Sequence, residues 1–210
     1  MVNLPTGQMK SREGTVVDAD DLFDEMHALA RTAALERVPE GAEPPADLEE
    51  RSEIIGLGAL KFMLLKFNPK TTMMFDPQAS LKFEGDTGPY VQYVCARINS
   101  IARKAAERGI ALAGTVDWSL TSSEEERSLA VTAARYPEVL KAAAEKMDCS
   151  AVVNYLLDLA KAFNRFYREK PVLNAEDPAV VSARLALCFA VRDLLTDGLQ
   201  TLTIGVPEAM

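Results

Sequence analysis

The stretch EGDTGPYVQYVCARINSIARKA, residues 84–105, decides how the rest of the chain is interpreted. It opens with turn residues and then runs on without a helix breaker. At about 100° per residue its apolar side chains fall on one stripe, which predicts a helix over roughly 88–108. We expect the buried face of this helix to consist of Val91, Val94, Ile98, Ile101, Ala102 and Ala105.

A second stripe of the same helix is aromatic and basic, and consists of Tyr90, Tyr93, Arg97, Ser100 and Lys104. Tyrosine rings and guanidinium groups offer flat faces on which an unstacked base can lie, and Arg and Lys contact phosphate. The Gly-Pro pair before the stripe predicts an exposed helix N-terminus that would suit an anion. Because Tyr–Arg stripes also serve protein interfaces, these residues alone leave RNA and protein open as partners.

The composition and the charge of the chain limit which kinds of protein it can be and which partners it can bind. The chain has 210 residues, 48% apolar and 26% charged, and is typical of a soluble globular protein. Its net charge of −8 argues against a general nucleic-acid binder and against DNA as a partner. Residues 51–110, however, hold 9 basic and 5 acidic side chains, against 4 and 12 in residues 1–50. This basic middle permits a local polyanion site.

Other chemistry is poorly supported by the sequence. Cys95, Cys149 and Cys188 are far apart, which favours reduced thiols and a cytoplasmic protein. His27 is the only histidine and lies in an acidic run, so no zinc site is expected. The apolar run at 54–65 is too short to span a membrane. Neither paired catalytic carboxylates nor a nucleophile–histidine pair is recognisable, which argues against an independent enzyme.

The periodicities predict an all-α fold, a helical bundle preceded by a loop and helix segment. Ser122 or Ser123 is the expected cap of the helix at 123–136, and Asp177 that of the helix at 178–203. Pro137 marks a break between the helices at 123–136 and 137–147. Gly56 and Gly58 lack the third glycine and the preceding strand of a nucleotide loop, and we expect them to allow close packing. The predicted elements are a loop over 1–17, helices over 18–36 and 48–66, a short strand within 71–75, and helices over 88–108, 123–136, 137–147, 149–169 and 178–203.

The helix expected at 149–169 is amphipathic. Val152, Leu156, Leu159, Phe163 and Phe166 share one face, and Lys161, Arg165 and Arg168 lie roughly opposite. The pattern predicts a basic outer face, and such a face is most often a charged surface in contact with solvent.

Residues 81–105, LKFEGDTGPYVQYVCARINSIARKA, resemble the motif that begins the helical anticodon-binding domain of arginyl-tRNA synthetases. Four more segments resemble the same family in the same order. Cysteinyl-tRNA synthetases have a related helical domain, but this combination is more similar to the arginyl family. The four segments are LPTGQMKSREGTVVDADDL (4–22), IIGLGALKFMLL (54–65), YLLDLAKAFNRFYREKPVL (155–173) and ARLALCFAVRDLLTDGLQTLTIGVPEAM (183–210).

The resemblance implies a C-terminal fragment of a class I synthetase. Residues 1–82 would be the end of the catalytic region, and residues 83–210 the anticodon-binding bundle. The intact enzyme would join arginine to tRNA(Arg) through arginyl-adenylate, using ATP and Mg²⁺. This chain would bind no cofactor, would be inactive alone, and would have tRNA(Arg) and the missing N-terminal catalytic domain as partners.

The resemblance also implies roles for particular residues. Lys10 and Arg12 lie in the family's signature loop, where cations contact the ATP phosphates, and Gln8 replaces its first lysine. Met210 follows Ala209, where the family often has arginine. The residues expected to bind RNA are Tyr90, Tyr93, Arg97, Asn164, Tyr167 and Met210, together with Lys104 from the stripe.

A different class of function remains open beside this one. The chain could be a non-catalytic helical module that has kept the fold but binds protein. The basic stripe discriminates between the two, because phosphate contacts weaken with salt and a protein interface tolerates it.

Overall fold

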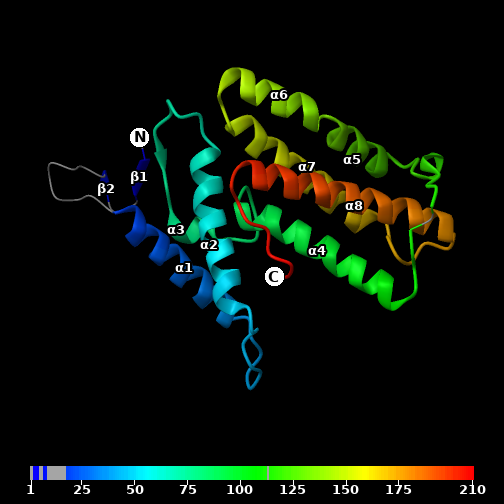
Figure 1. The fold of residues 1–210 in the computed structure, drawn as a ribbon, viewed down its shortest axis with the longest axis horizontal. Helices are drawn as coiled ribbons and strands as arrows, with labels where there is room; N and C mark the ends of the chain where they lie inside the picture. The colour runs from blue at the N-terminus through cyan, green and yellow to red at the C-terminus, as the bar shows by residue number, and fades with distance from the viewer. Residues whose placement is uncertain (1, 5–6, 9–17, 113) are drawn as a thin grey trace.

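The computed structural model describes residues 2–4, 7–8, 18–112 and 114–210 (Figure 1). It confirms the all-α fold, and the long helices lie within one or two residues of their expected bounds. They are α1 (Ala19–Leu35), α2 (Leu48–Leu65), α4 (Gly88–Glu107), α5 (Glu124–Ala134), α6 (Tyr136–Lys146), α7 (Ser150–Glu169) and α8 (Pro178–Thr201), with the short helices α3 (Pro77–Ser80) and η2 (Trp118–Leu120) between them.

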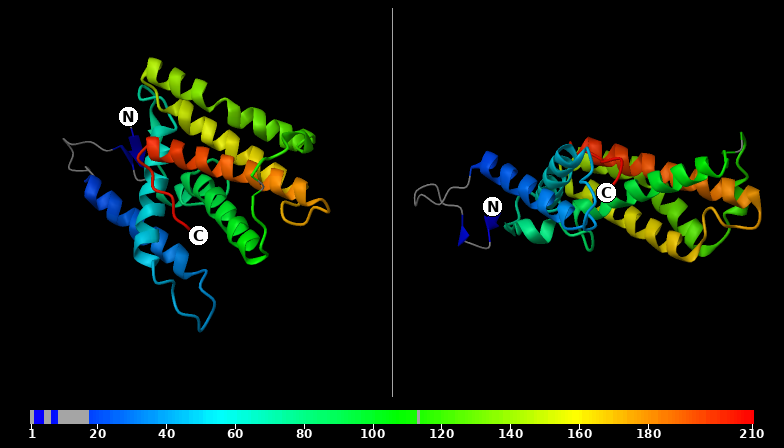
Figure 2. Two further views of the ribbon diagram at one scale, coloured as in Figure 1. Left: turned by 45° about the vertical axis from the view of Figure 1, so that its right-hand side comes forward. Right: turned by 90° about the horizontal axis from the view of Figure 1, so that it is seen from below.

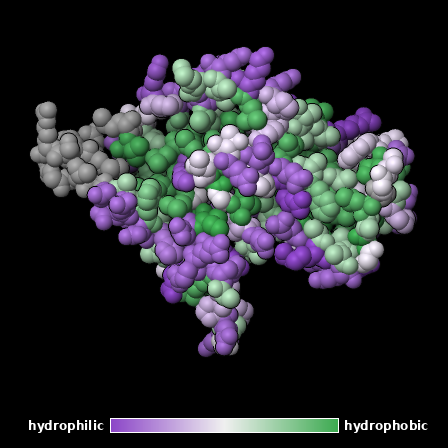
Figure 3. All heavy atoms as spheres, in the orientation of Figure 1, coloured by the Kyte–Doolittle hydropathy of each residue, from purple (hydrophilic) through white to green (hydrophobic). Residues whose placement is uncertain are grey.

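Helix α7 is the centre of a bundle, and contacts α4, α5, α6 and α8. Helices α1 and α2 form an antiparallel pair beside one end of this bundle, and α2 touches both α4 and α7 (Figures 1 and 2). Hydrophilic residues cover the outer side of α6 and the lower part of the α1–α2 pair in Figure 3. The buried apolar residues form two clusters between the helices.

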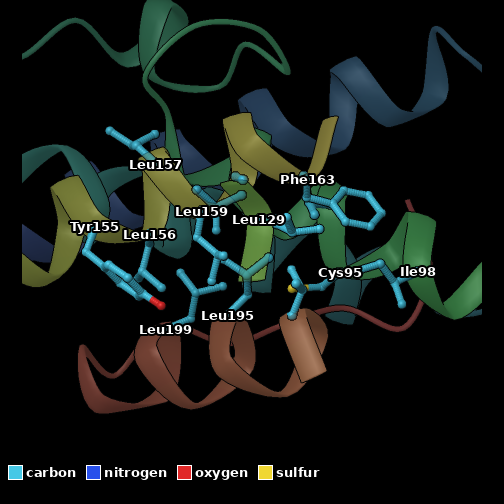
Figure 4. Close-up of a cluster of buried hydrophobic side chains, with 14 of the residues drawn as sticks. Cys95, Ile98, Leu129, Tyr155, Leu156, Leu157, Leu159, Phe163, Leu195 and Leu199 are labelled. Atoms are coloured by element: carbon cyan, nitrogen blue, oxygen red, sulfur yellow. The ribbon is translucent and has the colours of Figure 1, made fainter. Parts of the chain in front are cut away.

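The larger core cluster lies between the bundle helices (Figure 4). From α7 it takes Leu156, Leu159, Phe163 and Phe166, each fully buried, as their shared face predicted. The expected buried stripe of α4 is confirmed, except that Ala102 lies at its edge and is half-buried. A smaller cluster, made by Met26, Ala59, Leu60, Met73 and Phe75, lies under the α1–α2 pair.

Glycines allow α2 to pack closely against both α1 and α4. A Cβ atom on Gly88, the first residue of α4, would lie 2.8 Å from the carbonyl oxygen of Gly58 in α2. A Cβ atom on Gly56 would lie 2.7 Å from the carbonyl oxygen of Met26 in α1. The close packing expected at Gly56 and Gly58 is confirmed.

The same packing contradicts the expected anion site at the start of α4. Gly88 and Pro89 are buried against α2 instead of being exposed. The hydroxyl of Thr87 already accepts a hydrogen bond from the backbone N–H of Tyr90 at 3.2 Å. The prediction was wrong because a Gly-Pro start allows a close helix crossing as readily as an open N-terminus.

Short strands form a small sheet in the order β2–β1–β3. The strand expected within 71–75 is confirmed as β3 (Met73–Met74), which pairs in parallel with β1 (Val2–Leu4). The expectation of a loop over 1–17 was wrong in part, since β1 pairs antiparallel with β2 (Gly7–Gln8). Lys10 and Arg12 lie outside the described residues.

The helix caps follow the sequence closely. Ser123 and Glu126 form a reciprocal capping box at the start of α5, and Asp177 caps α8 before Pro178. The break expected at Pro137 falls two residues earlier, after Ala134, because a proline is tolerated inside the first turn of α6.

The division at residue 82/83 stays a prediction. Phe62 of α2, from the first of the two expected parts, packs into the larger core cluster of the bundle.

We expect Gly88→Ala to lower the free energy of unfolding by about 2 kcal/mol, because the added methyl group meets backbone that cannot move aside. Urea unfolding followed by circular dichroism measures this. Gly114→Ala is the matched control, since a Cβ atom there meets nothing within 4 Å. Equal stability of the two variants would contradict the tight crossing.

Glu126 joins α5 to α8. Its carboxylate accepts hydrogen bonds from Arg184 Nε at 2.7 Å and from the backbone N–H of Ser123 at 2.9 Å, and its side chain is only 2% exposed. Burial by itself would raise the pKa of Glu126, but the hydrogen bonds from Arg184 and Ser123 outweigh it and lower the pKa. The stability that Glu126 contributes is therefore present at neutral pH and lost as the pH falls through its folded-state pKa.

We expect Glu126→Gln to be less stable than the parent at pH 7 by about 2 kcal/mol, because the neutral amide pairs poorly with the buried guanidinium. The difference should shrink as the pH falls below about 4.3, where an unperturbed glutamate becomes protonated. Urea unfolding of both chains between pH 7 and pH 3 measures it. A difference that is constant over this range would contradict the assigned charge.

Candidate nucleic-acid interface

Arg97 of α4 is the centre of the surface to which the predicted RNA-binding residues belong. Its Nη1 donates a hydrogen bond to Asn164 Oδ1 of α7 at 2.6 Å. Asn164 Nδ2 in turn donates to the hydroxyl of Tyr90 at 2.9 Å. This chain of hydrogen bonds links the two helices and gives the guanidinium a neutral partner. Among the described residues, no carboxylate forms an ion pair with Arg97.

Two tyrosine rings flank the Arg97 guanidinium. Its carbon lies 4.7 Å from the ring centroid of Tyr93 and 5.2 Å from that of Tyr167. Such contacts stabilise a cation over an aromatic face. Tyr167 stacks on Phe163 of the core at 5.9 Å and is itself 40% exposed, so that a rigid aromatic side chain faces solvent.

The C-terminal segment brings Met210 to this surface from the far end of the chain. It runs beside α2 and passes in front of the first part of α4 (Figure 1). Lys61 Nζ binds the carbonyl of Thr203 at 2.7 Å, Gln92 Nε2 binds that of Gly205 at 2.8 Å, and Asn99 Nδ2 binds that of Glu208 at 3.2 Å. These side chains of α2 and α4 direct the last residues toward Tyr93.

Three adjoining hollows make the surface continuous along α4. The first, of about 540 Å³, is lined by Tyr90, Tyr93, Arg97, Asn164 and Met210 among others. The second, of about 370 Å³, shares Tyr93, Arg97 and Met210 with the first and adds Tyr167. The third, of about 720 Å³, shares Arg97 and Tyr167 and adds Lys104. The structure thus brings all seven predicted residues together, and their role in binding RNA stays a prediction.

Sequence reasoning missed Arg37 and Phe83, which line the first hollow. The Arg37 guanidinium carbon lies 4.0 Å from the Phe83 ring centroid, and Phe83 packs edge-on against Tyr93 at 6.1 Å. Phe83 lies directly before the opening stretch, and its aromatic character was a signal. Arg37 lies in the turn directly after α1, and no local pattern connects it with α4.

The basic outer face of α7 is neutralised by carboxylates. Lys161 binds Asp86 at 2.7 Å, Arg165 binds Glu124 at 3.3 Å, and Arg168 binds the neighbouring Glu169 at 2.9 Å. The hydrogen bond from Lys161 and the nearby charge of Lys66 lower the pKa of Asp86. This face is the solvated charged surface that such an amphipathic pattern usually indicates.

Other kinds of site are absent from the part of the chain that the structure describes. Within it, no group of three His, Cys, Asp or Glu side chains could hold a metal ion, and no helix is long and apolar enough to cross a membrane. Burial raises the pKa of the Cys95 and Cys188 thiols to about 12, so that neither is ionised at neutral pH.

Comparison with known proteins identifies the family. Residues 91–210 match the family model of the DALR anticodon binding domain. The chain belongs to this family. The match begins in the first turn of α4, directly after Tyr90, and covers the rest of α4, all of α7 and the C-terminal segment.

The relatives of this DALR chain are similar to it over its full length. It is 43% identical to an arginine–tRNA ligase of Parabacteroides distasonis and 42% identical to one of Treponema denticola, and covers 35% and 36% of them. Its fold is similar to that of the arginyl-tRNA synthetase of Thermus thermophilus, with a TM-score of 0.86 and 35% identity, over 100% of this chain and 34% of that one. The chain thus spans about a third of the relatives that it matches.

We expect Asn164→Ala to lower the free energy of unfolding by about 1.5 kcal/mol, because Arg97 and Tyr90 lose their shared partner. Urea unfolding measures this. Asn154→Ala is the control, since Asn154 is exposed on the same helix and bonds only within it, to the carbonyl of Ser150. An effect no larger than that of the control would contradict the bridging role of Asn164.

Proposed function

We propose that this chain is the anticodon-binding part of an arginyl-tRNA synthetase, and that the α4–α7 surface binds the anticodon loop of tRNA(Arg). The observation that carries the proposal is the Arg97 guanidinium, which lies between two tyrosine rings and has a neutral amide as its hydrogen-bond partner. Stacking surfaces combined with uncompensated cations are what an unpaired RNA loop requires.

Each group has a distinct part in this binding. Tyr167, supported from behind by Phe163, offers its exposed ring to an unstacked base. Arg97 keeps guanidinium N–H groups to donate to a phosphate, while Asn164 and Tyr90 hold its plane in place. Tyr93 and Met210 line the hollow beside it, where a base that leaves the stack can be enclosed.

The intact enzyme would attach arginine to its tRNA with ATP and Mg²⁺ in the cytoplasm. In that reaction Lys10 and Arg12 would contribute cations to the ATP phosphates as the adenylate forms. The remaining catalytic machinery would belong to a catalytic domain that this chain lacks, so we propose that the chain alone is inactive in aminoacylation. Its own contribution would be to hold the anticodon end of the tRNA.

The alternative, a module that binds another protein through the same surface, makes the opposite prediction about salt. No contact in the described part of the chain favours it over RNA. A protein-binding surface would keep its affinity at high salt, and would be indifferent to RNA.

The proposal is tested by Asn164→Asp. A carboxylate there can still accept from Arg97 and from the hydroxyl of Tyr90, so we expect the melting temperature to be kept. It also places a negative charge at the centre of the surface, so we expect the Kd for tRNA(Arg) to rise about tenfold at low salt, which corresponds to about 1.4 kcal/mol. Fluorescence anisotropy with labelled tRNA measures the Kd.

Asn154→Asp is the matched control, because it adds the same charge on the exposed side of α7, away from the three hollows. Its tRNA affinity should remain close to that of the parent. If both variants lose the same tRNA affinity, the loss is due to the change in net charge and not to the position of residue 164. If Asn164→Asp loses no affinity, the proposed binding surface is contradicted.

A further inference from the structure

The third hollow, between the C-terminal halves of α4 and α7, contains several cations, of which only Arg97 belongs to the aromatic cluster. It has a volume of about 720 Å³ and is closed on one side by the segment 170–174 that follows α7. Its lining includes five basic residues, Arg97, Lys104, Arg108, Arg168 and Lys170, and none of the described lining residues is acidic. In a chain of net charge −8 this is a local concentration of positive charge.

Three of these cations are aligned on one face of α4. Arg97, Lys104 and Arg108 are spaced by seven and then four positions, which is close to whole turns of an α-helix. Lys104 and Arg108 are exposed. The row begins at the Tyr93–Tyr167 cluster and leads away from it along the hollow.

The two arginines of this row have the same kind of partner. Arg97 Nη1 donates to Asn164 Oδ1 at 2.6 Å, and Arg108 Nη1 donates to Asn174 Oδ1 at 2.8 Å. An amide oxygen orients a guanidinium without cancelling its charge, and leaves further N–H groups free to donate. Both arginines thus line the hollow, and their hydrogen-bond partners there are neutral amides that do not cancel their positive charge.

Two cations outside the hollow, on α6 and on the outer face of α7, have carboxylate partners. Arg165 on the outer face of α7 binds Glu124, and Lys141 on α6 lies 4.0 Å from Glu145. Of the two remaining cations in the hollow, Lys170 binds Glu125 at 3.4 Å and Arg168 binds Glu169. The uncompensated charge of the hollow is therefore that of the α4 row.

We propose that this hollow, which we call the phosphate groove, binds the sugar-phosphate backbone of the RNA strand that continues from the bases held at Tyr167. The inference rests on the proposed function and deepens it. The groove reads no base, since its cations meet phosphates that are the same in every sequence. Base identity is recognised at the Tyr90–Tyr93–Tyr167 end, and much of the affinity comes from Lys104 and Arg108.

The test is the double variant Lys104→Met, Arg108→Met in the 210-residue chain. Binding of tRNA(Arg), and of the same tRNA with a changed anticodon, is measured by anisotropy from 50 to 300 mM salt. Each lost phosphate contact reduces the slope of log K against log salt by 0.7 to 0.9, so we expect the slope to fall by about 1.5. The ratio of the two affinities should stay that of the parent.

The matched control is Lys141→Met, Arg165→Met, which removes the same two charges from places outside the groove. We expect it to leave the slope within about 0.5 of the parent value, and circular dichroism checks that both variants are folded. If the slope changes equally in both double variants, the proposal that the groove binds phosphates is wrong. It is also wrong if the Lys104→Met, Arg108→Met variant no longer discriminates between the two tRNAs.

The outcomes also separate the groove from the proposed function. If the parent binds tRNA(Arg) selectively and Tyr167→Ala removes the selectivity, the proposed function stands, and a groove variant that matches its control then overturns the groove alone. If the parent binds neither tRNA, both proposals are overturned.

Discussion

The close crossing of α2 and α4 is the constraint on which the rest of this molecule depends. Gly58 and Gly88 leave no room for a side chain between the two backbones, and Gln92 fills the space beside them. Gln92 is fully buried and donates to the carbonyls of Ile54 and Gly205, at 3.3 and 2.8 Å. One glutamine thus joins α2, α4 and the C-terminal segment.

The binding surface is a consequence of this crossing. Because α4 starts against α2, its aromatic stripe turns toward α7 on one side and toward the end of α1 on the other, so that Arg97 reaches Asn164 and Phe83 reaches Tyr93. Because Gln92 holds Gly205, the last residues cross α4 and place Met210 beside Tyr93. The surface therefore combines parts of the chain that are more than 100 positions apart, with little freedom left in any of them.

How much of this was predictable depends on whether the signal was local. Helical periodicity is local, so the two stripes of α4, a serine cap at 122 or 123 and the buried face of α7 followed from the residues themselves. Pairing between distant segments is not local, and so the parallel pairing of β1 with β3, the Arg37–Phe83 contact and the carboxylate partner of Lys161 were missed. The resemblance to a family supplied Asn164, Tyr167 and Met210, which periodicity alone could not have connected with Tyr90.

The measurement that tests the central claim most directly compares the chain's affinity for tRNA(Arg) with its affinity for the same tRNA carrying a changed anticodon. It is made at several salt concentrations, with the Tyr90→Ala, Tyr167→Ala double variant alongside. An anticodon-binding surface predicts salt-sensitive binding that is weaker for the changed tRNA, and a variant that no longer distinguishes the two. Equal binding of both tRNAs by the parent chain, or binding that the variant leaves intact, would contradict the account.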